Sequence, residues 1–300
     1  MKTAVAFIVF NRPEVTRRVL ARIRDARPPT LFVIADGPRA GKPGEVERCA
    51  EVRAIIDELT DWPCEVRRNY SEVNLGCGRR VSSGLDWVFE HVEEAIILED
   101  DCLPDTSFFP FCEELLARYR YDERVAQIAG CSFLPANESS GGSYFFSRYP
   151  HCWGWATWRR AWANYDDAMT VWRTKAESSW VNGPERERER YAWKRAFDGV
   201  VRGTVDSWAY RWTAALWGRG GLSANSRVNL ISNLGFSDEA THTRTGRWGG
   251  LPTCSAILPP CGPVEVARDE RLDALVGRLV FEAPPLWERV MNRLRRSFNV

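Results

Sequence analysis

Short apolar runs alternate with longer stretches of helical periodicity through the first third of the chain. Residues 5–10 form an apolar run, and residues 13–24 have the pattern of an amphipathic helix with proline in its first turn. The same pattern predicts further strands at 31–35, 64–68 and 96–98, and further helices at 45–60 and 78–90. Strands and helices that alternate in this way predict an α/β fold, in which a mostly parallel sheet carries helices on both faces.

The last of these apolar runs ends in three consecutive acids, Glu99, Asp100 and Asp101. Three carboxylates cannot all be ionised at a buried strand end without a partner. The partner that this pattern favours is Mg²⁺ or Mn²⁺, held by one or two carboxylates and by phosphate oxygens of a substrate. The alternative is an acidic turn that caps the helix predicted at 108–119, because Asp105 lies just before that helix.

Polar residues also follow the other predicted strands. Asn11 follows the first strand, Asp36 ends the second, and the turn 74–76 precedes the helix at 78–90. The carboxyl ends of strands in an open α/β sheet form the crevice where ligands bind. We therefore expect these residues and the three acids to surround a bound nucleotide.

The composition changes after Gly130, because ten of the fourteen tryptophans lie between residues 153 and 217. Core packing accounts for most residues of this kind, since tryptophan buries a large area. Flat aromatic faces also bind the apolar faces of sugars, and both roles stay open here. Residues 241–250 are rich in glycine, threonine and arginine, which predicts a mobile loop that would serve as a lid.

Charge and cysteine usage restrict the class of protein. The 41 basic and 40 acidic residues nearly cancel, so no overall field selects a nucleic acid. Nine cysteines without a CxxC motif, and no secretion signal, predict reduced thiols in a cytoplasmic protein. No apolar stretch approaches the length of a membrane span.

The C-terminal residues form a separate pattern. Apolar side chains recur at helical spacing between 286 and 298, opposite several arginines. A basic amphipathic helix of this kind can lie on the inner face of a membrane as a peripheral contact, or pack on its own domain or on a second subunit. We expect three parts, at 1–130, at 131–250 and, as an extension, at 251–300.

With these residues in place, the chain resembles GT-A glycosyltransferases. It is similar to glycosyltransferase family 2 and, more distantly, to the N-acetylglucosaminyltransferase I family, over residues 3–245. The acids 99–101 take the place of the DXD motif, and the turn 74–76 resembles the family 2 turn beneath the donor. Residues 153–155 resemble a Trp-Gly-Trp segment, and Asp206 lies where such enzymes place their base.

The resemblance implies an inverting, metal-dependent hexosyltransferase or N-acetylhexosaminyltransferase of polysaccharide biosynthesis. In such an enzyme residues 1–130 would form the nucleotide-sugar-binding half and residues 131–250 the acceptor-binding and catalytic half. Its donor would be a nucleoside diphosphate sugar, with UDP favoured, and its acceptor a glycan, a lipid-linked group or a protein. The implied roles are catalysis by Asp206; nucleotide binding by Phe10, Arg12, Asp36, Asn74, Arg80, Glu99 and Asp100; acceptor or sugar contacts by Trp153, Gly154, Trp155 and Trp208; and metal binding by Asp101 and His242. The alternatives are a sugar nucleotidyltransferase and a catalytically silent carbohydrate-binding protein on the same fold.

Overall fold

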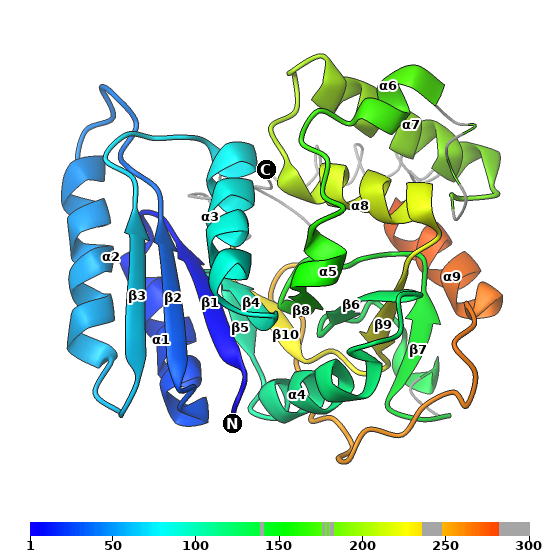
Figure 1. The fold of residues 1–300 in the computed structure, drawn as a ribbon, viewed down its shortest axis with the longest axis horizontal. Helices are drawn as coiled ribbons and strands as arrows, with labels where there is room; N and C mark the ends of the chain where they lie inside the picture. The colour runs from blue at the N-terminus through cyan, green and yellow to red at the C-terminus, as the bar shows by residue number, and fades with distance from the viewer. Residues whose placement is uncertain (139–140, 176–177, 179, 181–182, 236–247, 282–300) are drawn as a thin grey trace, which may run out of the picture.

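Eight strands form one sheet with helices on both faces in the computed structural model, which describes residues 1–138, 141–175, 178, 180, 183–235 and 248–281 (Figure 1). The first four strands are β1 (Ala4–Val9), β2 (Thr30–Ala35), β3 (Glu65–Tyr70) and β4 (Glu94–Glu99), and all four are parallel. The helices between them are α1 (Pro13–Ala26), α2 (Glu45–Leu59) and α3 (Cys77–His91). The α/β architecture predicted from the sequence pattern is therefore confirmed.

The second half of the chain extends the same sheet. Its strands in the sheet are β6 (Val125–Ala129), β7 (Tyr144–Ser147), β8 (Trp155–Trp158) and β9 (Leu222–Ser226). Its helices include α4 (Phe108–Tyr119), α5 (Arg159–Trp162), α6 (Thr170–Lys175), α7 (Glu187–Val201), α8 (Trp208–Arg219) and α9 (Glu270–Val276). The strand order is β3-β2-β1-β4-β8-β6-β9-β7, and β8 joins the two halves by pairing antiparallel with both β4 and β6.

The strand order reverses at β1. From β1 the chain passes through α1 to β2 and then through α2 to β3, and α3 brings it back to β4 on the opposite side of β1. The two outward crossovers place α1 and α2 together on one face, and α3 covers the other (Figure 1). A reversal of this kind opens a crevice at the carboxyl ends of the two central strands.

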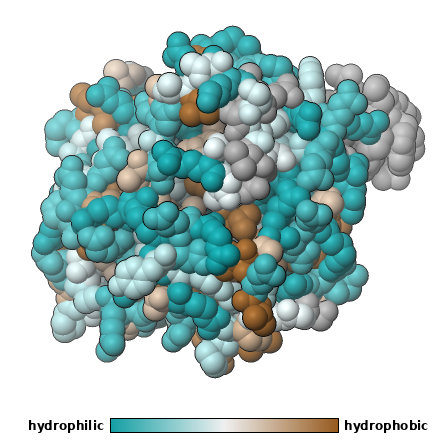
Figure 2. Space-filling view, turned by 45° about the vertical axis from the view of Figure 1, so that its right-hand side comes forward, coloured by the Kyte–Doolittle hydropathy of each residue, from teal (hydrophilic) through white to brown (hydrophobic). Residues whose placement is uncertain are grey.

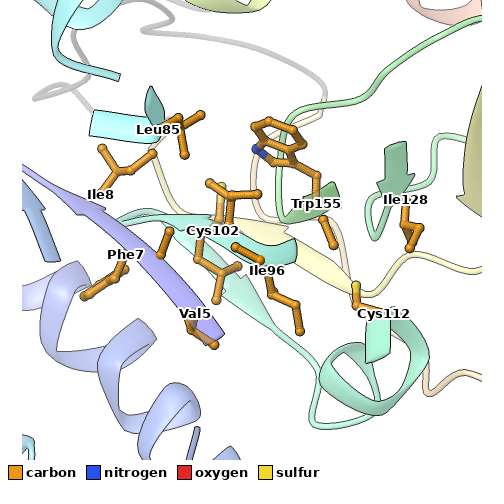
Figure 3. Packing of buried hydrophobic residues seen from close by; sticks show 14 of the residues in the cluster. Val5, Phe7, Ile8, Leu85, Ile96, Cys102, Cys112, Ile128 and Trp155 are labelled. Atoms are coloured by element: carbon orange, nitrogen blue, oxygen red, sulfur yellow. The ribbon is translucent and has the colours of Figure 1, made fainter. Parts of the chain in front are cut away.

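The core lies on both faces of these central strands (Figure 3). Ile8 points toward Leu85 of α3, while Val5 and Phe7 point to the opposite face, as the two-residue period of a strand requires. Trp155 is fully buried on the same side as Ile8. β8 pairs with β4, and Trp155 lies opposite Ile97 in this pair. The core of the tryptophan-rich half is therefore continuous with the core of the first half.

Most tryptophans of the second half belong to the core. Eight of the ten are buried, namely Trp155, Trp158, Trp162, Trp172, Trp193, Trp208, Trp212 and Trp217. The rings of Trp155 and Trp208 stack with their centroids 5.3 Å apart and their planes 19° apart. Such offset stacking adds to the stabilisation that burial already gives. The tryptophans that could have indicated a sugar-binding surface therefore serve, for the most part, to pack α5, α7 and α8 into the core.

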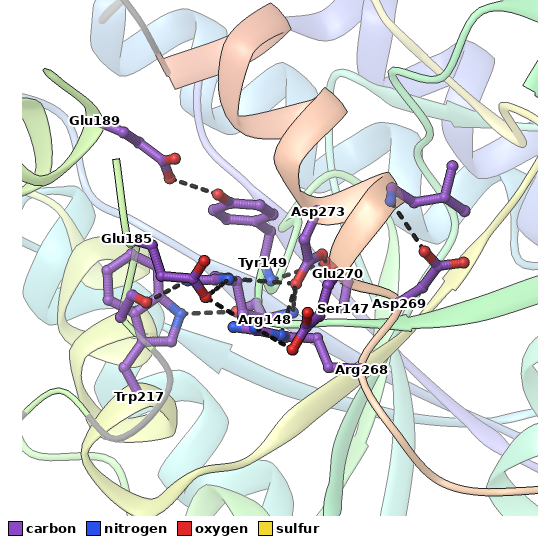
Figure 4. Close-up of polar contacts among 12 residues, drawn as sticks. Ser147, Arg148, Tyr149, Glu185, Glu189, Trp217, Arg268, Asp269, Glu270 and Asp273 are labelled. Atoms are coloured by element: carbon purple, nitrogen blue, oxygen red, sulfur yellow. Dashed lines mark hydrogen bonds and ion pairs between the residues drawn. The ribbon is translucent and has the colours of Figure 1, made fainter. Parts of the chain in front are cut away.

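The segment before α9 returns to the sheet through a buried network of charges (Figure 4). Asp273 of α9 is fully buried and accepts hydrogen bonds from Ser147 Oγ at 2.6 Å and from the backbone nitrogen of Arg148 at 3.1 Å. Residues of the predicted C-terminal extension thus pack directly on β7.

The exposed surface is mostly hydrophilic on the face shown in Figure 2, with hydrophobic atoms in small patches. Among the residues that the structure describes, no helix is both long and apolar enough to cross a membrane. The predicted amphipathic helix at 286–298 and most of the predicted loop at 241–250 lie outside those residues.

Candidate functional site

A pocket of about 380 Å³ lies at the carboxyl ends of β1 and β4, where the strand order reverses. In the register of these two parallel strands Ile8 lies beside Glu99, so the acids that follow β4 face the turn that follows β1. The polar residues that line the pocket are Arg12, Asp36, Arg39, Asn74, Arg80, Glu99, Asp100, Asp101, Asp206 and Asn233. Volume and position both suit a small-molecule site in an open α/β sheet.

Arg12 is the partner of two of the three consecutive acids. Its Nη1 lies 2.9 Å from Asp101 Oδ2, its Nη2 forms an ion pair with Asp100 Oδ1, and its Nε donates to Asp100 Oδ2 at 3.4 Å. Burial opposes the charge of Arg12, but the two carboxylates outweigh burial and raise the pKa of its guanidinium. Arg12 lines the pocket, and in this structure its guanidinium holds Asp100 and Asp101.

Glu99 has a different environment from its two neighbours. No described residue donates a hydrogen bond to its carboxylate. Burial, followed by the charges of Asp101 and Asp100, raises the pKa of Glu99 to about 8. A carboxyl group without a donor beside two carboxylates is a group that an incoming cation would stabilise.

Asp36 organises the turn before α3. Its Oδ1 accepts from the backbone nitrogens of Gly37 and Leu75, both at 2.9 Å. Its Oδ2 accepts from Asn74 Nδ2 at 3.0 Å and from the backbone nitrogen of Gly76 at 3.2 Å. These four donors occupy both oxygens of the Asp36 carboxylate. Asp36 and Asn74 line the pocket, and Asp36 fixes the shape of its wall.

Arg80 is an arginine with unused hydrogen-bonding capacity. It is only 5% exposed, its Nη2 donates to Asn69 Oδ1 at 2.9 Å, and its buried Nε has no partner in the structure. Burial lowers the pKa of Arg80, although the charge of Asp36 acts in the opposite direction. A buried cation that lines a pocket with an unpartnered donor indicates an anionic ligand.

Asp206 lies at the amino end of α3. Its Oδ1 accepts a hydrogen bond from the backbone nitrogen of Gly78 at 3.0 Å. Its Oδ2 lies beside Gly76, where a Cβ would come within 2.8 Å of it. The following residue, Ser207, caps α8. Asp206 is therefore held by two helix ends in the pocket wall.

The residues predicted to contact sugar or acceptor divide into two groups. Trp153 lines the pocket, and Phe133 packs against it with ring centroids 5.4 Å apart. The prediction of a direct contact is wrong for Trp155 and Trp208, because they are 0% and 2% exposed and belong to the core. Gly154 has a structural role, since its φ is +61° and a Cβ would overlap Ile231.

The sequence analysis missed several pocket residues, among them Arg39, Asn233 and Gly235. Arg39 lines the wall beyond β2, where the fully buried Glu45 accepts hydrogen bonds from its backbone nitrogen at 2.6 Å and from its Nε at 3.1 Å. Asn233 is the last residue of β10 (Ile231–Asn233), and Gly235 follows it closely. β10 pairs antiparallel with β5 (Cys102–Pro104), which comes directly after the three acids. No local motif indicates that these residues lie at the pocket, because their positions depend on tertiary contacts. His242 lies outside the described residues.

The acidic strand end provides the ligand chemistry that Mg²⁺ and Mn²⁺ prefer. Glu99 is the last residue of β4, Asp101 follows in the turn, and both line the pocket. At Gly235 a Cβ would overlap Asp101 Oδ2, so the absence of a side chain keeps the space beside that oxygen open. The described residues hold no cluster of three or more candidate ligands. One or two carboxylates completed by substrate phosphates are nevertheless a common arrangement for Mg²⁺.

Comparisons with known proteins add little to this geometry. No protein-family model and no curated protein matches the chain. The structure of S. aureus TarS 1–349 is similar at 10% identity with a TM-score of 0.39; the match covers 75% of this chain and 57% of that one. The 4-diphosphocytidyl-2C-methyl-D-erythritol synthase of Anaerococcus prevotii is similar at 11% identity with a TM-score of 0.32, covering 66% of this chain and 84% of that one. With TM-scores below 0.5, we draw no conclusion about function from either.

Proposed function

We propose that this protein is a glycosyltransferase that binds a nucleoside diphosphate sugar in the pocket between β1 and β4. The observation that carries the proposal is Arg80, a buried cation whose Nε has no partner and which lines the same pocket as the acidic strand end. A diphosphate supplies the acceptors that Arg80 lacks, and the carboxylates supply ligands for the cation that accompanies a diphosphate.

The charge balance of the pocket supports a ligand that arrives with a cation. Its described lining contains three arginines against five carboxyl groups, and the carboxylates stay in excess even when Glu99 is protonated. A diphosphate alone would add further negative charge to this space. We therefore propose Mg²⁺ or Mn²⁺ as the cofactor, with Asp101 and Glu99 as the residues that would hold it. When bound, such an ion neutralises the charge that develops on the leaving diphosphate.

The sugar and the acceptor are expected on the side of the pocket formed by β8 and β10. The strand order places the turn that Asp36 shapes at one end of the crevice, and Trp153, Asn233 and Asp206 reach the pocket from the second half of the chain. The flat ring of Trp153 suits the apolar face of a sugar or of a glycan acceptor. UDP is the nucleotide that the family resemblance favours.

Asp206 is the proposed general base. The acceptor hydroxyl forms a new bond to the anomeric carbon and gives its proton to the Asp206 carboxylate. The bond from that carbon to the diphosphate oxygen breaks, and its electron pair leaves with the nucleoside diphosphate. A single displacement of this kind inverts the anomeric configuration. Because Gly78 donates only to Oδ1, Oδ2 is the oxygen proposed to take the proton.

A thermal-shift panel tests the proposed ligand class. UDP, GDP, dTDP and CMP are each added with Mn²⁺, Mg²⁺ or EDTA. Saturation near 100-fold over the dissociation constant adds about 2.7 kcal/mol to the free energy of unfolding, which gives a measurable rise in Tm. The proposal expects a shift with a nucleoside diphosphate that EDTA removes. The absence of a shift with all four nucleotides would contradict it.

Asp206→Asn tests the catalytic role separately from binding. Loss of the base is expected to lower the rate of sugar transfer by about 10²- to 10⁴-fold, while the nucleotide-induced thermal shift stays close to that of the wild type. Transfer and donor hydrolysis are measured by release of the nucleoside diphosphate. Asp166→Asn and Asp167→Asn are matched controls, because neither residue lines the pocket. Undiminished transfer by the Asp206 variant would remove this residue from the mechanism.

A further inference from the structure

Arg12 contacts Asp100 and Asp101 unequally. The side chain of Asp100 is 3% exposed and accepts from Arg12 Nε, from Arg12 Nη2 and from the backbone nitrogen of Phe10 at 3.3 Å. The side chain of Asp101 is 15% exposed and contacts Arg12 through Nη1 alone. The contact with Asp101 is therefore the one that can break while the guanidinium stays bound to Asp100.

The backbone of Arg12 does not depend on the position of its side chain. Arg12 precedes α1, and its carbonyl oxygen accepts from the backbone nitrogen of Thr16 at 3.0 Å and from Thr16 Oγ1 at 2.7 Å. These two bonds begin the helix and fix the main chain. A change of side-chain rotamer would leave both of them in place, so the guanidinium can move without disturbing α1.

We propose that Arg12 is an exchangeable counter-ion, which leaves Asp101 when a divalent cation binds and then turns its freed Nη1 toward the diphosphate. The inference rests on the proposed function, because it requires a metal and a diphosphate in this pocket. The physical reason is competition, since Arg12 Nη1 lies 2.9 Å from the Asp101 oxygen that a metal would need. Two cations cannot share this oxygen at short range without strong repulsion.

The exchange predicts cooperative binding. A metal that enters alone has to displace Arg12 from Asp101 and leaves Nη1 without its acceptor. A diphosphate that enters alone meets a pocket in which carboxylates outnumber arginines. When both enter, the metal takes the carboxylate and the diphosphate accepts from Nη1. Each ligand therefore raises the affinity of the other, and by linkage the two effects are equal.

Isothermal titration of Mn²⁺ and UDP into the full chain tests this inference. Arg12→Ala removes the competitor, so Mn²⁺ alone is expected to bind about tenfold more tightly than to the wild type. UDP in saturating Mn²⁺ is expected to bind about tenfold more weakly, because the donor to the diphosphate is lost. The two affinities thus change in opposite directions. Arg17→Ala, in α1 and paired with the exposed Glu58, is the matched control and should change neither.

Two further measurements test the inference in case Arg12→Ala does not fold. Arg12→Lys keeps the charge but cannot contact both carboxylates with a planar group, so its Mn²⁺ affinity should lie between those of the wild type and Arg12→Ala. In the wild type, the Nε–H resonance of Arg12 should shift on addition of Mg²⁺ with UDP, and much less on addition of either alone.

The outcomes separate this inference from the proposed function. If the wild type binds UDP with Mn²⁺ but Arg12→Ala binds Mn²⁺ no more tightly, the counter-ion exchange is wrong and the proposed function stands. If the wild type binds no nucleoside diphosphate with any metal, the proposed function fails. Tighter Mn²⁺ binding by Arg12→Ala together with weaker UDP binding supports the exchange.

Discussion

Two networks of buried charge differ in how completely their groups are paired. Around Asp273, hydrogen bonds come from Ser147, from the backbone of Arg148 and from Arg148 Nε at 3.3 Å, and Arg148 also pairs with Glu185 at 3.0 Å (Figure 4). None of these residues lines the pocket between β1 and β4. The network joins β7, α9 and the segment before α7, and its charges are satisfied within the protein.

The network at the end of β4 is incomplete. Arg12 satisfies Asp100 and Asp101, but Glu99 accepts no hydrogen bond from a described residue, and Arg80 has a buried Nε without a partner. Buried polar groups are almost always paired in folded proteins, so those that are not require an explanation. The half-buried Glu99 and the buried Arg80 line one pocket. In this comparison the network that is fully paired within the protein lies away from the pocket, and the network that is incompletely paired lines it.

The largest effect is expected from breaking the saturated network. Asp273→Ala leaves Ser147 Oγ and the backbone nitrogen and Nε of Arg148 without their acceptor, which should lower the free energy of unfolding by about 3–5 kcal/mol. Urea denaturation measures this loss. Nucleotide binding by the folded variant should be unchanged below its lowered Tm. A variant of wild-type stability with impaired nucleotide binding would reverse the roles that we assign to the two networks.

Substitution of one arginine in each network gives a matched pair. Arg80→Met removes hydrogen bonds to a charged ligand, which should weaken UDP binding by about 1.5–3 kcal/mol. Its stability should change little, because the partner that it loses within the protein is the neutral Asn69 rather than a buried charge. Arg148→Met should do the reverse, since it removes the Nε donor and the positive charge that pair with the buried Asp273. Calorimetric titration and urea denaturation of both variants make the test. Equal losses of stability in the two variants would contradict the distinction between the ligand site and the structural network.

Sequence pattern predicted the first half of the fold well because each element there carries its own signal. The apolar run that ends at Glu99 forms β4, and the turn 74–76 leads directly into α3. Local periodicity was sufficient, since parallel strands buried on both faces are apolar throughout. The convergence of Asp36, Asn74 and the acids also followed from the rule that strand ends meet at one edge.

The partners of the site residues could not be predicted in this way. That Arg12 pairs with Asp100 and Asp101, and that Asp36 is occupied by the turn 74–76, depends on side-chain packing across the sheet edge. Trp153 and Trp155 are two residues apart in the sequence, yet Trp155 is fully buried and Trp153 lines the pocket. Composition does not distinguish them, because the same residue type serves both the core and the surface.

The last test concerns the unpaired Glu99 and is a dependence of stability on pH. Because burial and the neighbouring Asp101 and Asp100 raise the pKa of Glu99 to about 8, the folded protein keeps a proton that the unfolded chain releases near pH 4.5. Stability contributed by this group is therefore full below pH 4.5 and falls as pH rises toward 8, by at most about 1.4 kcal/mol per pH unit. Glu99→Gln has no carboxyl to ionise, so urea denaturation should show its stability rising relative to wild type across that interval. Parallel curves for the two proteins would mean that the Glu99 carboxylate is already stabilised by a partner, and the contrast between the two networks would then rest on Arg80 alone.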